Sequence, residues 1–127
     1  MESQSFDNDK LLFHSLKQIK DACEMIKIWN QDVESVEDYL SSPSGMKTLA
    51  ATCMLIESIG EASKKIDRHF YDFLSLNAPE IPWKEIKGMR DYIAHGYFNI
   101  DADIVYDVVK NELKHLISAI NRLLESI

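Results

Sequence analysis

The sequence has no hydrophobic run near the roughly 20 residues that a membrane-spanning helix needs. Glycine and proline are also scarce, with four and three residues in a chain of 127, so long irregular segments are not expected. The first ten residues, MESQSFDNDK, are polar and acidic, unlike a secretory signal, which begins with basic residues and continues with apolar ones. These features predict a single domain, residues 1–127, in the cytoplasm and without a membrane partner.

Patterns typical of metal and redox sites are absent as well. No CxxC or HExxH spacing occurs, and the four histidines are scattered along the chain. The two cysteines, Cys23 and Cys53, fall on apolar helical stripes, where buried thiols are more common than redox or metal-binding ones. The sequence therefore predicts neither a metal site nor a cofactor.

Positive charge is in the minority, because 14 lysines and arginines face 21 acidic residues, for a net charge of −7. Such a balance argues against long-range attraction to nucleic acid. Contact with RNA would then depend on a basic partner subunit or on a local patch. Lys84, Lys87 and Arg90 repeat every three residues and are candidates for phosphate contacts, although such a ridge is more often an ordinary solvated face.

Apolar residues at helical spacing are abundant. A first helix is expected over residues 9–29, with a stripe formed by Leu12, Leu16, Ile19, Cys23 and Ile26. A long helix is expected over residues 45–66, and its apolar face narrows to small residues at Gly60 and Ser63. Glycine inside a helix costs roughly 1 kcal/mol relative to alanine. Gly60 therefore indicates a close helix crossing or the close approach of another chain.

Further helices complete an all-α pattern. A short helix is expected around residues 35–40, with Ser35 as its N-cap, before the break at SSPSG. Residues 69–82 read as a connector, and Pro82 suits the first position of the next helix. The last helix should begin at Asp101 or Asp103, with a stripe formed by Val109, Leu113, Leu116, Ile120, Leu123 and Ile127. The pattern predicts an antiparallel bundle of four main helices plus one short helix.

The segment MRDYIAHGYF, residues 89–98, places polar groups where a helix core is expected. Arg90 and Tyr97 share the apolar face that begins at Trp83, and a buried guanidinium is costly unless it is paired. His95 would lie about 140° from Arg90 around a regular helix. The two side chains can converge only if the helix distorts near Gly96 or if a second molecule contributes. Alternatively, Arg90 pairs with an acid such as Asp91, and His95 caps the helix.

The segment IPWKEIKGMRDYIAHGYFNID resembles the signature of the HepT-like branch of the HEPN superfamily. The R-x-x-x-x-H-x-Y pattern of that family is matched by Arg90, His95 and Tyr97. The I-P-W that precedes it is matched by residues 81–83, and an earlier I-G-E-A by residues 59–62. One departure from the family pattern is Asp91, where the family often has asparagine. A carboxylate at this position would weaken the local attraction for phosphate.

The resemblance implies a homodimeric, metal-independent ribonuclease toxin with a HEPN-like helical fold. Arg90 and His95 would be its catalytic residues, in a composite site on the dimer axis, with Asp91 and Glu61 supporting them. Glu61 is expected to pair with a neighbouring cation, such as Arg90. The implied partner is a minimal nucleotidyltransferase that silences the toxin by transferring AMP to Tyr97. Tyr97 could instead be an ordinary core tyrosine.

A second interpretation is a non-catalytic scaffold that binds nucleotide or recruits the nucleotidyltransferase. The net charge of −7 and Asp91 favour this interpretation, whereas the complete R-x-x-x-x-H-x-Y pattern favours the ribonuclease. A purely structural bundle would leave Arg90 on an apolar face without an explanation.

Overall fold

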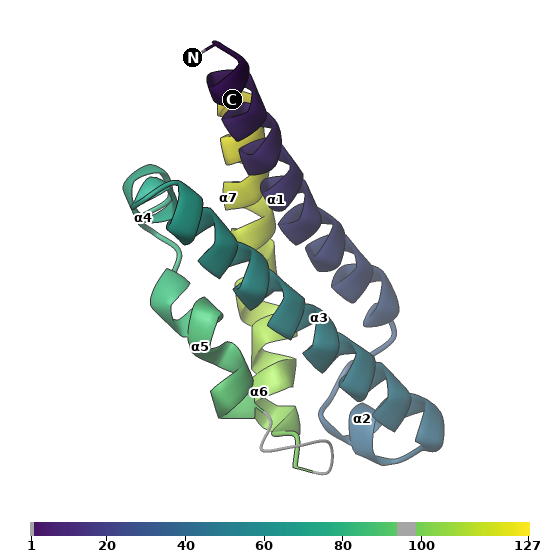
Figure 1. Ribbon diagram of the computed structural model, residues 1–127. Helices are drawn as coiled ribbons and strands as arrows, with labels where there is room; N and C mark the ends of the chain where they lie inside the picture. Colours follow the sequence, from purple (N-terminus) through teal and green to yellow (C-terminus); the bar gives the residue numbers. More distant parts are fainter. Residues whose placement is uncertain (1, 94–98) are drawn as a thin grey trace.

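The computed structural model describes residues 2–93 and 99–127, and within these ranges it leaves out the side chains of residues 2–6, 90, 92 and 93. Its elements are α1 (Glu2–Trp29), α2 (Glu37–Leu40), α3 (Pro43–His69), α4 (Phe73–Asn77), α5 (Trp83–Ile93), α6 (Ala102–Asp107), the π-helical segment η1 (Val108–Glu112) and α7 (Leu113–Ser126). The predicted all-α bundle is confirmed. Its four main helices are α1, α3, α5 and the rod made by α6, η1 and α7 (Figure 1).

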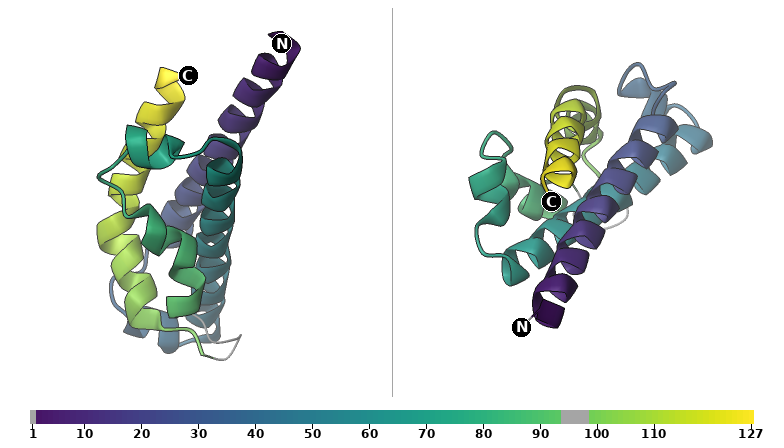
Figure 2. Two further views of the ribbon diagram at one scale, coloured as in Figure 1. Left: turned by 60° about the vertical axis from the view of Figure 1, so that its left-hand side comes forward. Right: turned by 90° about the horizontal axis from the view of Figure 1, so that it is seen from above.

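The long helix α3 organises the bundle. It packs against α1 on one side and against α5 on another, and α1 also packs along α7. Figure 2 shows α5 lying between α3 and the α6–η1–α7 rod. All five residues of the predicted α1 stripe are buried, as are Leu49, Cys53, Ile56, Gly60 and Ser63 on α3. The apolar faces read from the sequence therefore form one shared core.

Helix α1 begins seven residues earlier than the expected Asp9, at Glu2. The expectation rested on the apolar stripe, which starts at Leu12. Polar residues can extend an existing helix, because propagation adds a hydrogen bond for each residue that is fixed.

No helix in the described part of the chain is long and apolar enough to cross a membrane.

The start of α3 lies inside the segment that was expected to break the helical pattern. Ser42 caps the helix by accepting a hydrogen bond from the Gly45 amide at 2.9 Å, and Pro43 occupies the first turn, where its missing N–H is not needed. The predicted N-cap of α2 is wrong. Ser35 instead donates its backbone N–H to the Asp38 carboxylate at 3.2 Å, and Val36 precedes the helix without a side-chain cap.

Two differences concern the second half of the chain. The connector over residues 69–82 contains the short helix α4, and Pro82 lies one residue before α5, where its carbonyl accepts from the Ile86 amide at 3.0 Å. The last helix is capped by Asp101, which accepts from the Ile104 amide at 3.2 Å. It is then interrupted by η1, which the stripe did not predict. Leu113, Leu116, Ile120 and Leu123 are buried, whereas Val109 is half-buried and Ile127 is exposed.

A buried polar network joins α1, α2 and α3. Asn30 donates to the Thr52 hydroxyl at 2.9 Å and to the Ile26 carbonyl at 2.8 Å, and it accepts from the Tyr39 hydroxyl at 2.6 Å. Burial raises the pKa of Tyr39 to about 12. Cys23 and Cys53 are both buried, and burial raises the pKa of the Cys23 thiol to about 12. The Cys23 thiol is therefore a poor nucleophile in the folded protein.

Candidate functional site

Helix α5 carries the first half of the R-x-x-x-x-H-x-Y pattern, and its N-terminal end is firmly held. Trp83 is buried and donates its indole N–H to the Ala78 carbonyl at 2.9 Å. Ile81, which precedes it, is also buried. The I-P-W signature thus has a structural role, because it anchors the start of the helix that presents Arg90.

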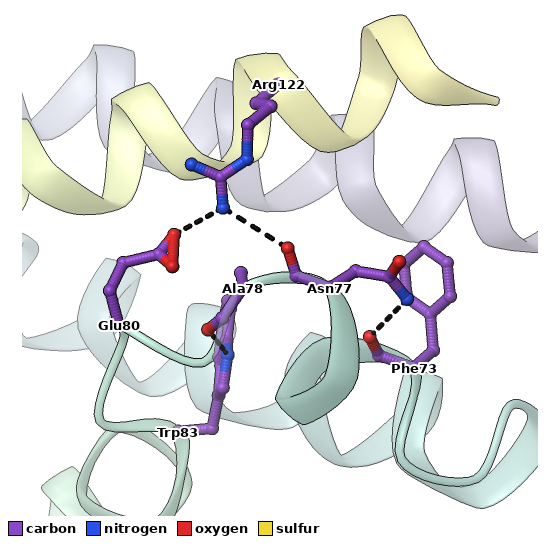
Figure 3. A network of polar contacts seen from close by, with 6 residues as sticks. All are labelled: Phe73, Asn77, Ala78, Glu80, Trp83 and Arg122. Atoms are coloured by element: carbon purple, nitrogen blue, oxygen red, sulfur yellow. Dashed lines mark hydrogen bonds and ion pairs between the residues drawn. The ribbon is translucent and has the colours of Figure 1, made fainter.

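An exposed polar clasp fastens the same segment to α7 (Figure 3). Arg122 reaches from α7 to pair with the Glu80 carboxylate, and it donates to the Asn77 carbonyl at 3.2 Å. The hydrogen bond from Arg122 lowers the pKa of Glu80. The clasp joins the end of α4 and the turn before α5 to the last helix, so it fixes where α5 begins.

Gly60 sets the distance between α3 and α5. A Cβ atom at this position would lie 2.9 Å from the Ile86 carbonyl oxygen and 3.6 Å from that of Lys87. Cβ atoms essentially never approach another heavy atom so closely, so at this separation of the two helices the position requires glycine. Of the two explanations for Gly60, the helix crossing is therefore the one observed, and it brings α5 against the middle of α3.

The predicted catalytic residues lie at and beyond the far end of α5. The backbone of Arg90 belongs to this helix, one turn after Ile86, and Asp91 is exposed beside it. The side chain of Arg90 and the whole of His95 and Tyr97 lie outside the described residues. Their convergence therefore stays a prediction, as does the supporting role of Asp91.

The remaining predicted site residues have identifiable surroundings. Glu61 is exposed and pairs with Lys64 at 3.3 Å, which is one neighbouring cation of the kind expected. Lys87 is partly buried and pairs with Asp67 of α3. Lys84 is exposed on α5. The pair with Asp67 neutralises much of the charge that Lys87 would offer to a phosphate, so the basic ridge is weaker than its spacing suggests.

One feature near the site was not foreseen. A cavity of about 420 Å³ lies beside α5, and residues of α1, α3, α6, η1, α7 and the turn before α5 also line it. No local sequence pattern indicates it, because its lining residues come from several helices that are distant in the sequence. Within the described ranges, no group of three or more His, Cys, Asp or Glu side chains gathers as a metal site.

Known proteins provide an independent comparison. A family model described as "Ribonuclease HepT-like" matches residues 14–123. A protein of Thermococcus cleftensis named "Probable ribonuclease HepT" is 38% identical over 101 residues, which cover 80% of this chain and 84% of that protein. A protein of Caldanaerobacter subterraneus, named as an inferred RNase, is 31% identical over 91 residues, covering 72% of this chain and 75% of that protein.

A third relative, from Methanocaldococcus jannaschii, carries the name of a gamma-glutamylcyclotransferase joined to an inferred RNase. It is 31% identical over 113 residues, or 88% of this chain and 47% of that protein. No solved structure matches the chain with comparable significance. The family match spans all of α3 and α5, including the R-x-x-x-x-H-x-Y segment, and the predicted resemblance is confirmed: the chain belongs to the HepT-like ribonuclease family of the HEPN superfamily.

Proposed function

We propose that this protein is the ribonuclease toxin subunit of a toxin–antitoxin pair. It cleaves RNA without a metal ion at a site shared by two subunits of a homodimer. A minimal nucleotidyltransferase partner silences it by transferring AMP to Tyr97. The observation that carries the proposal is the complete R-x-x-x-x-H-x-Y pattern at the end of α5, in a chain of the HepT-like ribonuclease family. The names of the relatives from Thermococcus and Caldanaerobacter support the ribonuclease part.

The proposed reaction is an internal transfer at phosphorus. The 2′-oxygen forms a bond to the phosphorus as its proton passes to a neutral imidazole, and the bond from phosphorus to the 5′-oxygen breaks. A protonated imidazole gives its proton to that leaving oxygen, so a 2′,3′-cyclic phosphate and a free 5′-hydroxyl result. Histidine suits both proton transfers, because its pKa lies near neutrality. The arginine fork suits the charge that accumulates on the phosphate oxygens.

The need for an acid and a base explains why two subunits are proposed. Each chain supplies one motif histidine, His95, and one motif arginine, Arg90. A twofold axis that brings the two motifs together provides both proton carriers in one cleft. It also provides two guanidinium groups, which matter because the chain carries a net charge of −7 and Lys87 is paired with Asp67.

The proposed silencing follows from charge and size. Tyr97 lies two residues after His95, so a nucleotide attached to its hydroxyl would sit close to the catalytic groups. The phosphate of AMP adds negative charge where the RNA phosphate should bind, as phosphorylation does at other sites. In the transfer, the tyrosine oxygen bonds to the α-phosphorus of ATP, pyrophosphate leaves, and the phenolic proton passes to solvent.

The ribonuclease activity is tested with purified wild type and with Arg90→Ala and His95→Ala, in buffer that contains a chelator. Wild type should cleave RNA and leave cyclic phosphate ends, and each variant should be slower by about 10²-fold or more. Lys114→Ala, on the exposed face of α7, is the matched control and should cleave at the wild-type rate. If wild type leaves RNA uncut, or if the variants cut equally well, the scaffold interpretation replaces the ribonuclease.

The modification is tested by intact mass spectrometry of the protein after co-expression with the nucleotidyltransferase encoded beside it. Wild type should gain the mass of one or more adenylate groups, and Tyr97→Phe should not. Tyr71→Phe, at an exposed tyrosine before α4, is the matched control and should be modified like wild type. Adenylate on Tyr97→Phe would place the acceptor elsewhere.

A further inference from the structure

The cavity beside α5 has an apolar interior. Ile56 of α3, Ile86 and Met89 of α5, and Val108 of η1 are among its lining residues. Its volume of about 420 Å³ falls in the usual range for ligand pockets, roughly 300–1,000 Å³, and far exceeds the roughly 30 Å³ that one water molecule occupies. The space is therefore large enough for apolar side chains from another molecule.

The mouth of this cavity is acidic. Glu80, Glu85, Asp107 and Glu112 line it, and His115 is the only basic side chain among the described lining residues. Glu80 is paired with Arg122. No ion pair within the described part of the chain involves the other three carboxylates. This rim repels the phosphates of RNA and attracts a cationic partner.

The carboxylates also lie on both sides of the opening. Glu85 belongs to the first turn of α5, whereas Asp107 ends α6 and Glu112 ends η1. Figure 2 shows α5 beside the α6–η1–α7 rod. Carboxylates on two walls suit a protein segment that carries several basic side chains.

The local backbone supports a binding role. The segment η1 is a π-helical turn, a rare form that occurs frequently at functional sites, and both of its ends, Val108 and Glu112, line the cavity. The other wall is α5, where Met89 directly precedes Arg90. An occupant would therefore touch the helix that carries the catalytic motif.

We infer that this cavity is a docking site for a partner protein, which inserts an apolar side chain flanked by lysines or arginines between α5 and η1. The inference rests on the apolar interior, the acidic rim on two walls and the π-helical turn. It does not depend on the ribonuclease chemistry. The carboxylates recognise the basic flanks, and the cavity recognises the apolar side chain.

The probe for this inference is a labelled helical peptide with a leucine stripe flanked by lysines, titrated into the full chain by fluorescence anisotropy. Binding should be lost when the lysines of the peptide are replaced by glutamates, and also when its leucines are replaced by serines. Equal binding of the serine peptide would mean that charge alone is recognised, and equal affinity for a simple alkylamine would identify a small-molecule site. Either result would overturn the inference.

Protein variants locate the binding. Glu85→Lys combined with Glu112→Lys should lower the affinity for the peptide by at least about tenfold. Glu37→Lys combined with Glu125→Lys changes the net charge equally at exposed positions outside the cavity lining, and should bind like wild type. Val108→Trp should also weaken binding by filling the cavity. Similar affinity in the two charge-reversed proteins would refute the proposed rim.

Methionine methyl resonances provide a second readout in the unmutated protein. Met89 lines the cavity, whereas Met46 and Met54 are exposed on α3 and do not line it. Peptide binding should shift the Met89 signal and leave the Met46 and Met54 signals in place. If the Met46 or Met54 signal shifts and the Met89 signal does not, the peptide binds another face of the protein and the inference is overturned. Because the assay requires no RNA, a protein that fails to cut RNA could still pass it.

Discussion

The contact of α1 and α2 with α3 and the cavity between α5 and η1 are built differently. At the first, Asn30, Thr52 and Tyr39 are all at most 2% exposed, and their polar atoms satisfy one another. At the second, carboxylates surround a cavity and the helical ladder widens into a π turn. The first contact is typical of a packed core, where buried polar groups are paired. The second has empty space and, among the described residues, carboxylates such as Glu85 and Glu112 that form no ion pair, which supports the proposed binding role.

The largest effect is expected from disrupting the buried polar network, which tests whether the two regions differ in how their polar groups are paired. Asn30→Ala leaves the Tyr39 hydroxyl without its acceptor and the Thr52 hydroxyl without its donor, both in buried positions. We expect a loss of about 3 kcal/mol in the free energy of unfolding, measured by urea denaturation. Asn111→Ala removes an exposed hydrogen bond to Asp107 and should change stability by less than about 0.5 kcal/mol. Equal losses of stability from the two substitutions would mean that the buried network adds nothing to the free energy of unfolding.

Enlarging a side chain in each region tests the same difference, because a packed core resists added volume and a cavity does not. Ala22→Leu inserts methylenes into the packed face of α1 and should cost about 1–3 kcal/mol in urea denaturation. Val108→Leu adds a methylene at the cavity wall and should stay within about 0.5 kcal/mol of wild type, because the new atoms have space to occupy. A large loss from Val108→Leu would show that the cavity side is as tightly packed as the other.

Gly60→Ala probes the crossing that positions α5. The new Cβ would lie 2.9 Å from the Ile86 carbonyl oxygen, so the two backbones must separate. Alanine regains about 1 kcal/mol of helix propensity, and the overpacking costs more, so we expect a net loss of about 1 kcal/mol. Thermal unfolding measures this loss. Ser58→Ala, on the exposed face of the same helix, should leave the melting temperature unchanged, and a stabilised Gly60→Ala would contradict the tight crossing.

The smallest effect concerns the clasp between Glu80 and Arg122. Because the pKa of Glu80 is lowered in the folded protein, its contribution is present above the ordinary glutamate value near 4.3 and is lost as the pH falls through the lower folded value. Glu80→Gln should therefore be slightly less stable than wild type at neutral pH and indistinguishable from it in strong acid. Thermal melts across this range test the claim, and a difference that persists in acid would contradict it.

The helices and their buried faces could be predicted because periodicity records which side of each helix meets the core. The stripe from Leu12 to Ile26 and the face from Leu49 to Ser63 are examples. Helix ends were less accurate, because Ser42 and Pro43 can begin a helix as readily as they end one. The pairing of Lys87 with Asp67 was not predicted, since the two residues are 20 positions apart and meet only where α3 and α5 cross.

The candidate site likewise contains residues that could be identified from the sequence and features that could not. Arg90, His95 and Tyr97 were identified from their spacing and from the family resemblance, and the family is confirmed. The cavity and its acidic rim could not be identified, because Glu85, Asp107 and Glu112 share no local pattern. They come together only through the packing of α5 against the rod that contains η1.

The amino-acid sequence by itself determined the all-α class, the core faces and the family, because each depends on residue type at a fixed local spacing. The tertiary structure decided the roles of Asn30, Gly60 and the acidic rim. Each of those roles depends on which atoms from distant segments come within a few ångströms, and local spacing does not specify that distance.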